Sequence, residues 1–445
     1  MILAITILIL TLIWAWFSLS NKSSTNDSHL NLEAKFFLLV IGLYTLPLPT
    51  AVLLGMEGGN LSIYIDNFSP WLPSALYFTS AFILSFVVFY KWVLLSGQKN
   101  NTYCLSKLTN RTRFKLIWWS IFGICILLLH LLARDVGGVL SLVFSGYRVT
   151  ELFVGQGHFA VSFEWLVSLA VILMSYGIVL KRSFAIRWAW ILGVLLFFTL
   201  VIMGRRGLLA VMILAYVYLA IQAGWIKRLH RFFVPGLFLF IVMNWLGLVR
   251  GESYTDIIDL VTILFTKTLE LGDGDGLLIM LFYTLIYGNF VVPFETLPQI
   301  MGSLSQSWDY WFGWTIPRSF ATLIPNFLMP DRPLPMSNWY METYYGGGLM
   351  LNEGRQFFFL SEAFLNFGWF GLIIWGLVIA AVFKFFFDSQ TSEVTYWKLA
   401  LRALFFGSLL NFVASDTTGF FVAYLKGWAL IPLVFALLDK KNAKN

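Results

Sequence analysis

Long apolar runs alternate with short polar loops along almost the whole chain. The runs are about 17–25 residues long, the length that an α-helix needs to cross the hydrocarbon core of a membrane. They predict eleven spanning helices, at 2–19, 36–55, 71–95, 115–133, 159–180, 186–203, 207–223, 233–249, 361–386, 397–414 and 418–438. The pattern therefore predicts an all-α polytopic membrane protein.

The region between the eighth and ninth spans has a different pattern. Residues 256–271 place apolar side chains on one helical stripe and polar ones on the other, which is typical of a helix in the membrane interface. Residues 277–294 are apolar, but a glycine and a proline interrupt them, so a re-entrant segment is favoured over a hairpin that would give thirteen spans. We expect one transmembrane domain over residues 1–445, in which 250–360 forms a large periplasmic loop with interfacial or re-entrant helices.

Lysine and arginine in the short loops predict the orientation. The basic loops 97–114, 181–187 and 224–232 and the basic tail 440–444 fall on one face if the spans alternate. That face should be cytoplasmic, with the N-terminus outside and the C-terminus inside. The first apolar run has no basic start and no convincing cleavage site, so we expect an uncleaved helix.

Composition agrees with this class and excludes others. Hydrophobic residues make up 59% of the 445 positions and charged residues 12%, well below the soluble norm of about 25%. The net charge of +7 comes mostly from the cytoplasmic loops, and no basic patch with interleaved base-stacking aromatics suggests a nucleic-acid partner. Cys104 and Cys125, one in a basic loop and one in an apolar run, suggest neither a disulfide framework nor a metal site.

Arginine, unlike lysine, is retained on the predicted outer face. Thirteen of the fifteen lysines lie at or near the cytoplasmic face, whereas eight of the fifteen arginines lie outside: Arg134, Arg148, Arg205, Arg206, Arg250, Arg318, Arg332 and Arg355. The guanidinium group is a rigid fork of donors that matches phosphate oxygens. The distribution indicates phosphate recognition; the alternative is that single arginines snorkel or pair with neighbouring acids.

Two outer segments carry candidate anion-binding residues. Gly204-Arg205-Arg206-Gly207 is a tight two-arginine turn between spans, which could also be a merely solvated turn. The glycine-containing loop 134–158 carries Arg148 and His158. His158 could act as a general base, but a hydrogen-bonded structural role is favoured.

A third segment combines prolines, glycines and a carboxylate. Its parts are Ile316-Pro317-Arg318, the loop Ile324–Pro333, the run Gly346-Gly347-Gly348 and the stretch Ser361–Gly368. The prolines place Arg332 on a rigid backbone, and the glycines permit a close turn near a ligand. Glu362 lies at the head of a span, where an ionisable group is a functional candidate.

For the other polar and aromatic residues, a purely structural role is an alternative to a functional one. Asp273-Gly274-Asp275 could hold a divalent ion, but a solvated turn is favoured, and we expect no metal and no cofactor. Glu164 and Lys426 lie inside spans and could pair or line a cavity. The aromatic residues of the outer loop are interfacial anchors or, alternatively, sugar-stacking platforms: Trp308, Trp311, Trp314, Trp339 and Tyr340.

The arginine turn Gly204–Gly207, the loop Ile324–Pro333 and the stretch Ser361-Glu362…Asn366-Phe367-Gly368 together resemble oligosaccharide repeat-unit polymerases of the Wzy type. These include the O-antigen and enterobacterial common antigen polymerases. The layout of the spans and the large outer loop is similar too. The resemblance implies a glycosyltransferase of the bacterial inner membrane whose active site faces the periplasm. Its substrates would be undecaprenyl-diphosphate-linked glycans, its surroundings membrane lipid, and a further partner a protein that regulates chain length.

The resemblance also implies roles for residues. Family members rely on periplasmic arginines, and the matching positions here are Arg148, Arg205, Arg206, Arg250 and Arg332, the last where a lysine is frequent. As a mechanism, we expect Arg206 and Arg250 to stabilise the departing diphosphate in catalysis, while Arg148, Arg205, Arg332 and Arg355 bind it. Glu362, or as second choice Glu342, would take the proton from the acceptor hydroxyl.

Two other functions stay open at this point. An O-antigen ligase-like transferase of lipid-linked glycans would share the architecture and the arginines. A polysaccharide transporter should show broken helices in both halves and paired charges at mid-membrane. In this chain the polar residues instead gather on one face.

Overall fold

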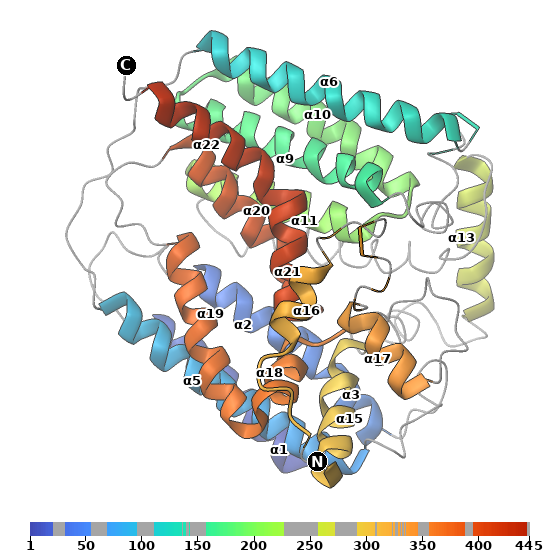
Figure 1. The fold of residues 1–445 in the computed structure, drawn as a ribbon, viewed down its shortest axis with the longest axis vertical. Coiled ribbons are helices and arrows are strands. Elements are labelled where there is room, and N and C mark those ends of the chain that lie inside the picture. Colours follow the sequence, from blue (N-terminus) through green and yellow to red (C-terminus); the bar gives the residue numbers. More distant parts are fainter. Residues whose placement is uncertain are drawn as a thin grey trace. The chain divides into compact units, whose positions relative to one another are not determined.

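The computed structural model describes residues 1–20, 32–54, 69–95, 111–135, 137–138, 142, 157–226, 257–271, 292–307, 309–322, 324, 328–329, 331, 333, 335–345, 356–387 and 395–442. These residues form helices and turns and contain no β-strand (Figure 1), which confirms the all-α prediction for this part of the chain. They belong to two compact units, each assembled from segments far apart in the sequence. The single transmembrane domain stays a prediction.

Among the described residues, eight helical segments are long and apolar enough to cross a membrane: Ile2–Ser20, Leu32–Leu53, Ser69–Val93, Arg111–Asp135, Val161–Val179, Ser183–Ile202, Phe359–Phe387 and Thr417–Leu437. They confirm a multi-pass architecture. The predicted spans at 207–223 and 397–414 are also helical, as α11 (Arg206–Gln222) and α20 (Tyr396–Val413). The predicted span 233–249 lies outside the described residues, so the count of eleven stays a prediction.

The first unit contains residues 1–100, 283–390 and 409–422. Its helices are α1 (Ile2–Ser20), α2 (Leu32–Thr45), α3 (Pro47–Leu53), η2 (Ser69–Trp71), α5 (Leu72–Leu95), α15 (Val292–Ser307), α16 (Thr315–Ala321), α17 (Met336–Tyr345), α18 (Phe359–Phe367), η5 (Gly368–Phe370), α19 (Gly371–Phe387) and the first residues of α21 (Thr417–Tyr424). Helix α5 packs along both α1 and α19. Its residues Phe82 and Phe86 form a fully buried aromatic core with Phe37, Phe359 and Phe383.

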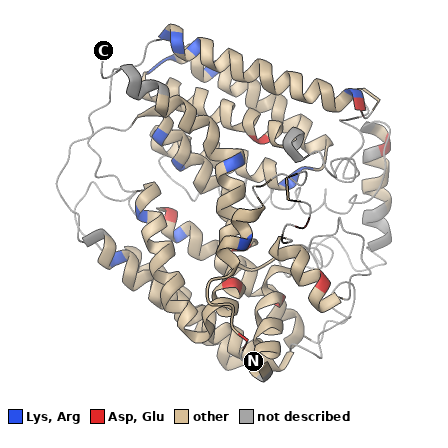
Figure 2. Ribbon diagram, viewed as in Figure 1, with Lys and Arg blue, Asp and Glu red and all other residues tan. Residues whose placement is uncertain are grey.

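The second unit contains residues 101–282, 391–408 and 423–445. Its helices are α6 (Arg111–Asp135), α9 (Gly157–Val179), α10 (Ser183–Ile202), α11, α13 (Ile257–Leu271), most of α20, η6 (Leu425–Ala429) and α22 (Leu430–Asn442). Figure 1 shows α6, α9 and α10 side by side, with α9 packed against both neighbours. Figure 2 shows the charged residues of α6 only at its two ends, as the sequence pattern requires of a spanning helix.

The amphipathic helix expected at 256–271 is present as α13. Leu264 is buried, whereas Ile258 and Phe265 on the same helix are exposed. An exposed apolar stripe on a helix too short to span is typical of the membrane interface. The re-entrant segment expected at 277–294 lies outside the described residues, apart from the start of α15.

The last two spanning segments are interrupted rather than regular. Between α18 and α19, Gly368 adopts φ +56°, and the turn η5 redirects the chain. Between α21 and α22, residues 425–429 form a π-helix, a wider turn that inserts one extra residue. Both interruptions lie beside clusters of polar side chains, as described next.

Candidate functional site

Glu362 is fully buried and joins three segments of the first unit. Its carboxylate accepts hydrogen bonds from the Thr315 hydroxyl (2.7 Å), the Thr418 hydroxyl, and the backbone N–H groups of Thr417 and Thr418. Those N–H groups are the free donors at the start of α21, a place that favours a negative charge. Glu362 therefore caps a helix that follows it by more than fifty residues.

The other polar residues of the Ser361–Gly368 stretch are buried as well. The hydroxyls of Ser361 and Thr296 lie 2.6 Å apart, which joins α18 to α15. The Asn366 amide donates to the Thr315 hydroxyl (2.8 Å), and its carbonyl oxygen accepts from the Gly313 N–H (3.0 Å). Thr315 thus links Glu362 and Asn366. Glu362 and Asn366, both in the stretch that the sequence singled out, therefore share one hydrogen-bond network through Thr315, which the sequence did not single out.

Asp416, which the sequence analysis missed, is the second carboxylate of this cluster. It is buried and accepts hydrogen bonds from the Gly419 N–H (2.7 Å) and the Ser319 hydroxyl (3.4 Å). Burial, with the charge of Glu362 in addition, raises the pKa of Asp416 to about 7. The local signal was only an Asp before Thr-Thr-Gly, which any helix N-cap can show.

Arg318 is the cation of this cluster. Its guanidinium lies over the ring of Trp311 at 5.4 Å and near that of Trp339 at 6.0 Å. Partial burial lowers the pKa of Arg318, and the charges of Glu342 and Asp416 oppose that effect. Arg318 therefore lies against an aromatic pair, and the charges of two carboxylates act on it.

Residues 311–314 form an aromatic turn that directly precedes α16, the helix of Arg318. Its backbone closes the C-terminus of α18, because Trp311 and Phe312 donate N–H bonds to the carbonyls of Leu365 and Asn366, both 3.0 Å. Phe312 adopts φ +47°, an unfavourable conformation for a bulky residue, and its side chain is exposed. Trp314 is exposed too. The two backbone hydrogen bonds to α18 fix the conformation of this strained turn, whose side chains Phe312 and Trp314 are exposed.

Glu342, the second predicted base, lies on α17 and is exposed. Its charge acts on Arg318. The same helix is anchored by Tyr340, which is fully buried and donates a hydrogen bond to Gln299, and by Tyr345, which donates to Glu295 (2.9 Å). Buried Tyr340 is thus a core residue of the first unit, neither an interfacial anchor nor a sugar-stacking surface.

A second charged cluster lies within the second unit. The charges of Lys426 and Arg205 both act on the carboxylate of Glu164, which is part-buried on α9. Lys426 belongs to the π-helix η6, whose backbone carbonyl at Lys426 accepts from the Trp165 indole (3.1 Å). The two intramembrane residues noted in the sequence therefore do interact, and they do so with a predicted phosphate-binding arginine.

The wider turn of η6 makes room for Glu164. An ideal Cβ at Gly427 would lie 1.5 Å from the nearer Glu164 carboxylate oxygen, so only glycine fits there without moving the acid.

The arginine turn lies between α10 and α11. Gly204 adopts φ +64°, and Arg205 donates its N–H to the Leu200 carbonyl (2.9 Å). Arg206 is the first residue of α11.

Four predicted site residues lie outside the described residues: Arg148, Arg250, Arg332 and Arg355. Asp273 and Asp275 lie outside them as well. Within the described ranges, no group of three or more His, Cys, Asp or Glu side chains is placed to hold a metal ion. The described predicted residues fall into two groups, with Glu362 and Glu342 in the first unit and Arg205 and Arg206 in the second.

Comparison of the chain with protein-family models, curated proteins and solved structures gave no match. The site is therefore interpreted from its own geometry.

Proposed function

We propose that this protein is a membrane glycosyltransferase that joins oligosaccharide units carried on a polyprenyl diphosphate, as the Wzy-type polymerases do at the periplasmic face of the bacterial inner membrane. The observation that carries the proposal is the buried pair Glu362 and Asp416 beside Arg318. Glycosyl transfer to a sugar hydroxyl needs a base that titrates near neutral pH, and Asp416 has such a pKa.

In this proposal Asp416 accepts the proton of the acceptor hydroxyl, and Glu362 positions it. The Glu362 carboxylate already accepts four hydrogen bonds and caps α21. Asp416 directly precedes that helix, and the charge of Glu362 raises its proton affinity. The sequence-based choice of Glu362 as the base is therefore refined into a two-carboxylate proposal.

The arginines would stabilise the departing lipid diphosphate. Arg205 and Arg206 stay charged at all relevant pH values and bind phosphate oxygens bidentately. The charges of Arg205 and Lys426 both act on the carboxylate of Glu164, and Arg206 follows Arg205 directly in the turn. Arg148, Arg250, Arg332 and Arg355 keep the diphosphate-related roles expected from the sequence.

The aromatic turn 311–314 would bind the carbohydrate. Phe312 and Trp314 are exposed in the same turn as Trp311, over whose ring the Arg318 guanidinium lies. Flat aromatic faces near a donor-rich cation suit a sugar ring, which has apolar C–H faces and a polar rim. If Phe312 and Trp314 are only anchors at the membrane interface, their substitution should leave the rate of glycosyl transfer unaffected.

The test is polymer formation by purified protein in liposomes with a polyprenyl-diphosphate oligosaccharide as the only sugar source. The wild type should yield lipid-linked products of two, three and more units, with and without EDTA. Arg206→Ala should abolish the longer products, and Arg206→Lys, which keeps the charge but loses the fork, should fall between. Wild-type chain lengths from Arg206→Ala would contradict the assignment. Transfer of finished polymer to lipid A core, without elongation, would indicate the ligase instead.

A transporter is the second candidate, favoured by the electrostatic interaction of Glu164 with Lys426 at an interrupted helix. The same liposomes discriminate between the two functions. A transporter moves the lipid-linked oligosaccharide from one leaflet to the other, where an added glycosidase can reach it, without any increase in its length. Elongation in detergent, where there are no leaflets, would exclude transport as the explanation.

A further inference from the structure

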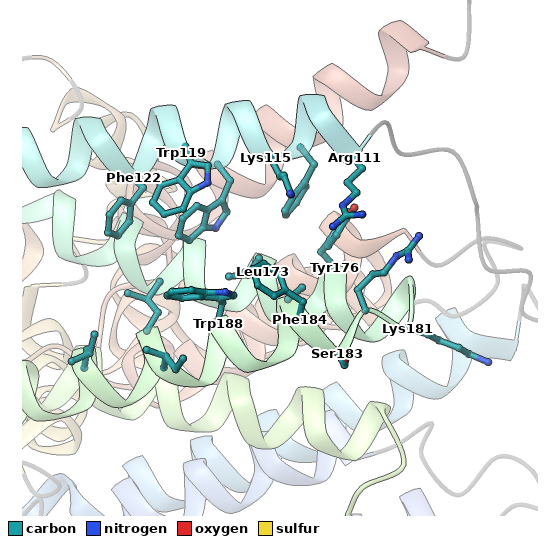
Figure 3. A pocket seen from close by; sticks show the side chains of 17 residues that line it. Arg111, Lys115, Trp119, Phe122, Leu173, Tyr176, Lys181, Ser183, Phe184 and Trp188 are labelled. Carbon is teal, nitrogen blue, oxygen red and sulfur yellow. The ribbon is translucent and has the colours of Figure 1, made fainter.

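A pocket of about 510 Å³ lies among α6, α9 and α10 of the second unit (Figure 3). It differs from the sites above because cations occupy one of its ends and aromatic rings the other. Figure 3 shows Arg111 and Lys181 toward one end, Trp119 and Phe122 toward the opposite end, and Lys115 between Trp119 and Arg111. The pocket thus has the polarity of an amphiphile with one charged end.

Four cations and no acidic residue are among its seventeen lining residues, all of them within the described chain. Arg111 and Lys115 come from the first two turns of α6, and Lys181 and Arg182 from the turn before α10. All four side chains are exposed. Since no carboxylate lines the pocket, the cations there leave an uncompensated positive charge for a ligand to meet.

The backbone at this end adds to the same preference. Helix α10 begins here, at Ser183, and helix N-termini favour anions. Lys181 adopts φ +51°, a conformation in which glycine or asparagine is usual. A lysine at such a position carries a backbone cost and gives the turn one more cation.

The remainder of the pocket is apolar. Trp118, Phe122, Trp188 and Leu195 line it, and several of these side chains are partly exposed on helices that qualify as membrane spans. A small soluble anion gains no free energy from contact with apolar side chains, whereas a hydrocarbon chain buries its apolar surface against them. The volume lies within the roughly 300–1,000 Å³ usual for ligand sites.

We propose that this pocket binds an anionic phospholipid of the surrounding bilayer. The phosphate would lie among Arg111, Lys115 and Arg182, and one acyl chain would run along Trp119 and Trp188. The basic end is the one that the sequence predicts to be cytoplasmic, so the lipid would come from the cytoplasmic leaflet. This site is separate from Arg205 and Arg206 and does not depend on the proposed transferase activity.

The test is native mass spectrometry of the detergent-solubilised protein, titrated with phosphatidylglycerol or, in parallel, with phosphatidylcholine. The wild type should bind one phosphatidylglycerol with clear preference. The double variant Lys115→Gln/Arg182→Gln should bind it roughly 30-fold more weakly, as expected for the loss of two membrane-surface cations. The matched control Arg113→Gln/Arg187→Gln removes the same charge from α6 and α10 outside the pocket and should bind like the wild type.

A second pair of variants tests the apolar wall. Trp188 and Trp190 on α10 are exposed to similar extents, but only Trp188 lines the pocket. Trp188→Leu should weaken phosphatidylglycerol binding, and Trp190→Leu should not. Equal binding of the two lipids, equal loss in both charge variants, or full displacement by inorganic phosphate at millimolar concentration would overturn the proposal.

Discussion

The Glu362 carboxylate accepts hydrogen bonds from both the hydroxyl and the backbone N–H of Thr418. This double contact ties α18 to the start of α21, and the Thr417 N–H and the Thr315 hydroxyl donate to the same carboxylate. Because all these groups are buried or part-buried, removal of one donor leaves acceptor oxygens that water does not readily reach.

The first prediction concerns Thr315. Thr315→Val keeps the shape of the side chain but removes a donor to Glu362 and an acceptor for Asn366. We expect a loss of about 1–3 kcal/mol in the free energy of unfolding, visible as a lower melting temperature in detergent. Thr315→Ser retains the hydroxyl and should stay much closer to the wild type. Equal melting temperatures for Thr315→Val and the wild type would contradict the network.

The second prediction is a pH dependence set by Asp416. Its pKa is raised from an ordinary 3.8 to about 7, so between these values the folded state holds more protons than the unfolded state. The contribution of Asp416 to stability is therefore most favourable below pH 4, decreases as the pH rises to about 7, and then stays constant. In Asp416→Asn this part of the decrease should vanish in melting curves recorded from pH 4 to pH 8.

The same substitution tests the chemistry. If Asp416 accepts the proton, wild-type transfer should increase with pH up to about 7 as the carboxylate loses its own proton. Asp416→Asn should remove both this rise and most of the activity. An unchanged rise in the variant would assign it to another group.

The third prediction concerns Gly427. Gly427→Ala places a methyl group where the Glu164 carboxylate lies, so the acid must move away or the π-helix must shift. We expect destabilisation of roughly 1–3 kcal/mol, measured by thermal unfolding in detergent. Gly123→Ala on α6 is the control, because a Cβ there meets no atom within 4 Å. It should be neutral, or stabilising by up to about 1 kcal/mol.

The fourth prediction concerns the stacking of Arg318. Arg318→Lys keeps the positive charge but loses the planar group that lies over Trp311 and Trp339. We expect transfer in liposomes to fall at least tenfold while the melting temperature changes little. Arg187→Lys, an exposed arginine of the second unit, should leave transfer unchanged. A full wild-type rate for Arg318→Lys would remove Arg318 from the proposed site.

The membrane-spanning helices could be predicted because the signal is local. Each span needs an apolar run of sufficient length, and the run lies within the sequence of the helix itself. The same reasoning found α13 through its amphipathic stripe, and Glu362 and the Arg205–Arg206 turn because charge is rare in such surroundings. Residue type and position along the chain were enough in these cases.

The partners of those residues were not predictable, because they come from distant parts of the chain. Glu362 and Thr418 are 56 positions apart, and the charge of Lys426 acts on Glu164 across a much larger sequence separation. Asp416 was missed because its own sequence context is that of any helix N-cap, and only the fold places the charge of Glu362 near it. By itself the sequence determined that this chain crosses a membrane many times and where its unusual charges lie. Only the tertiary structure decided which charges meet, since long-range packing sets their burial and their neighbours.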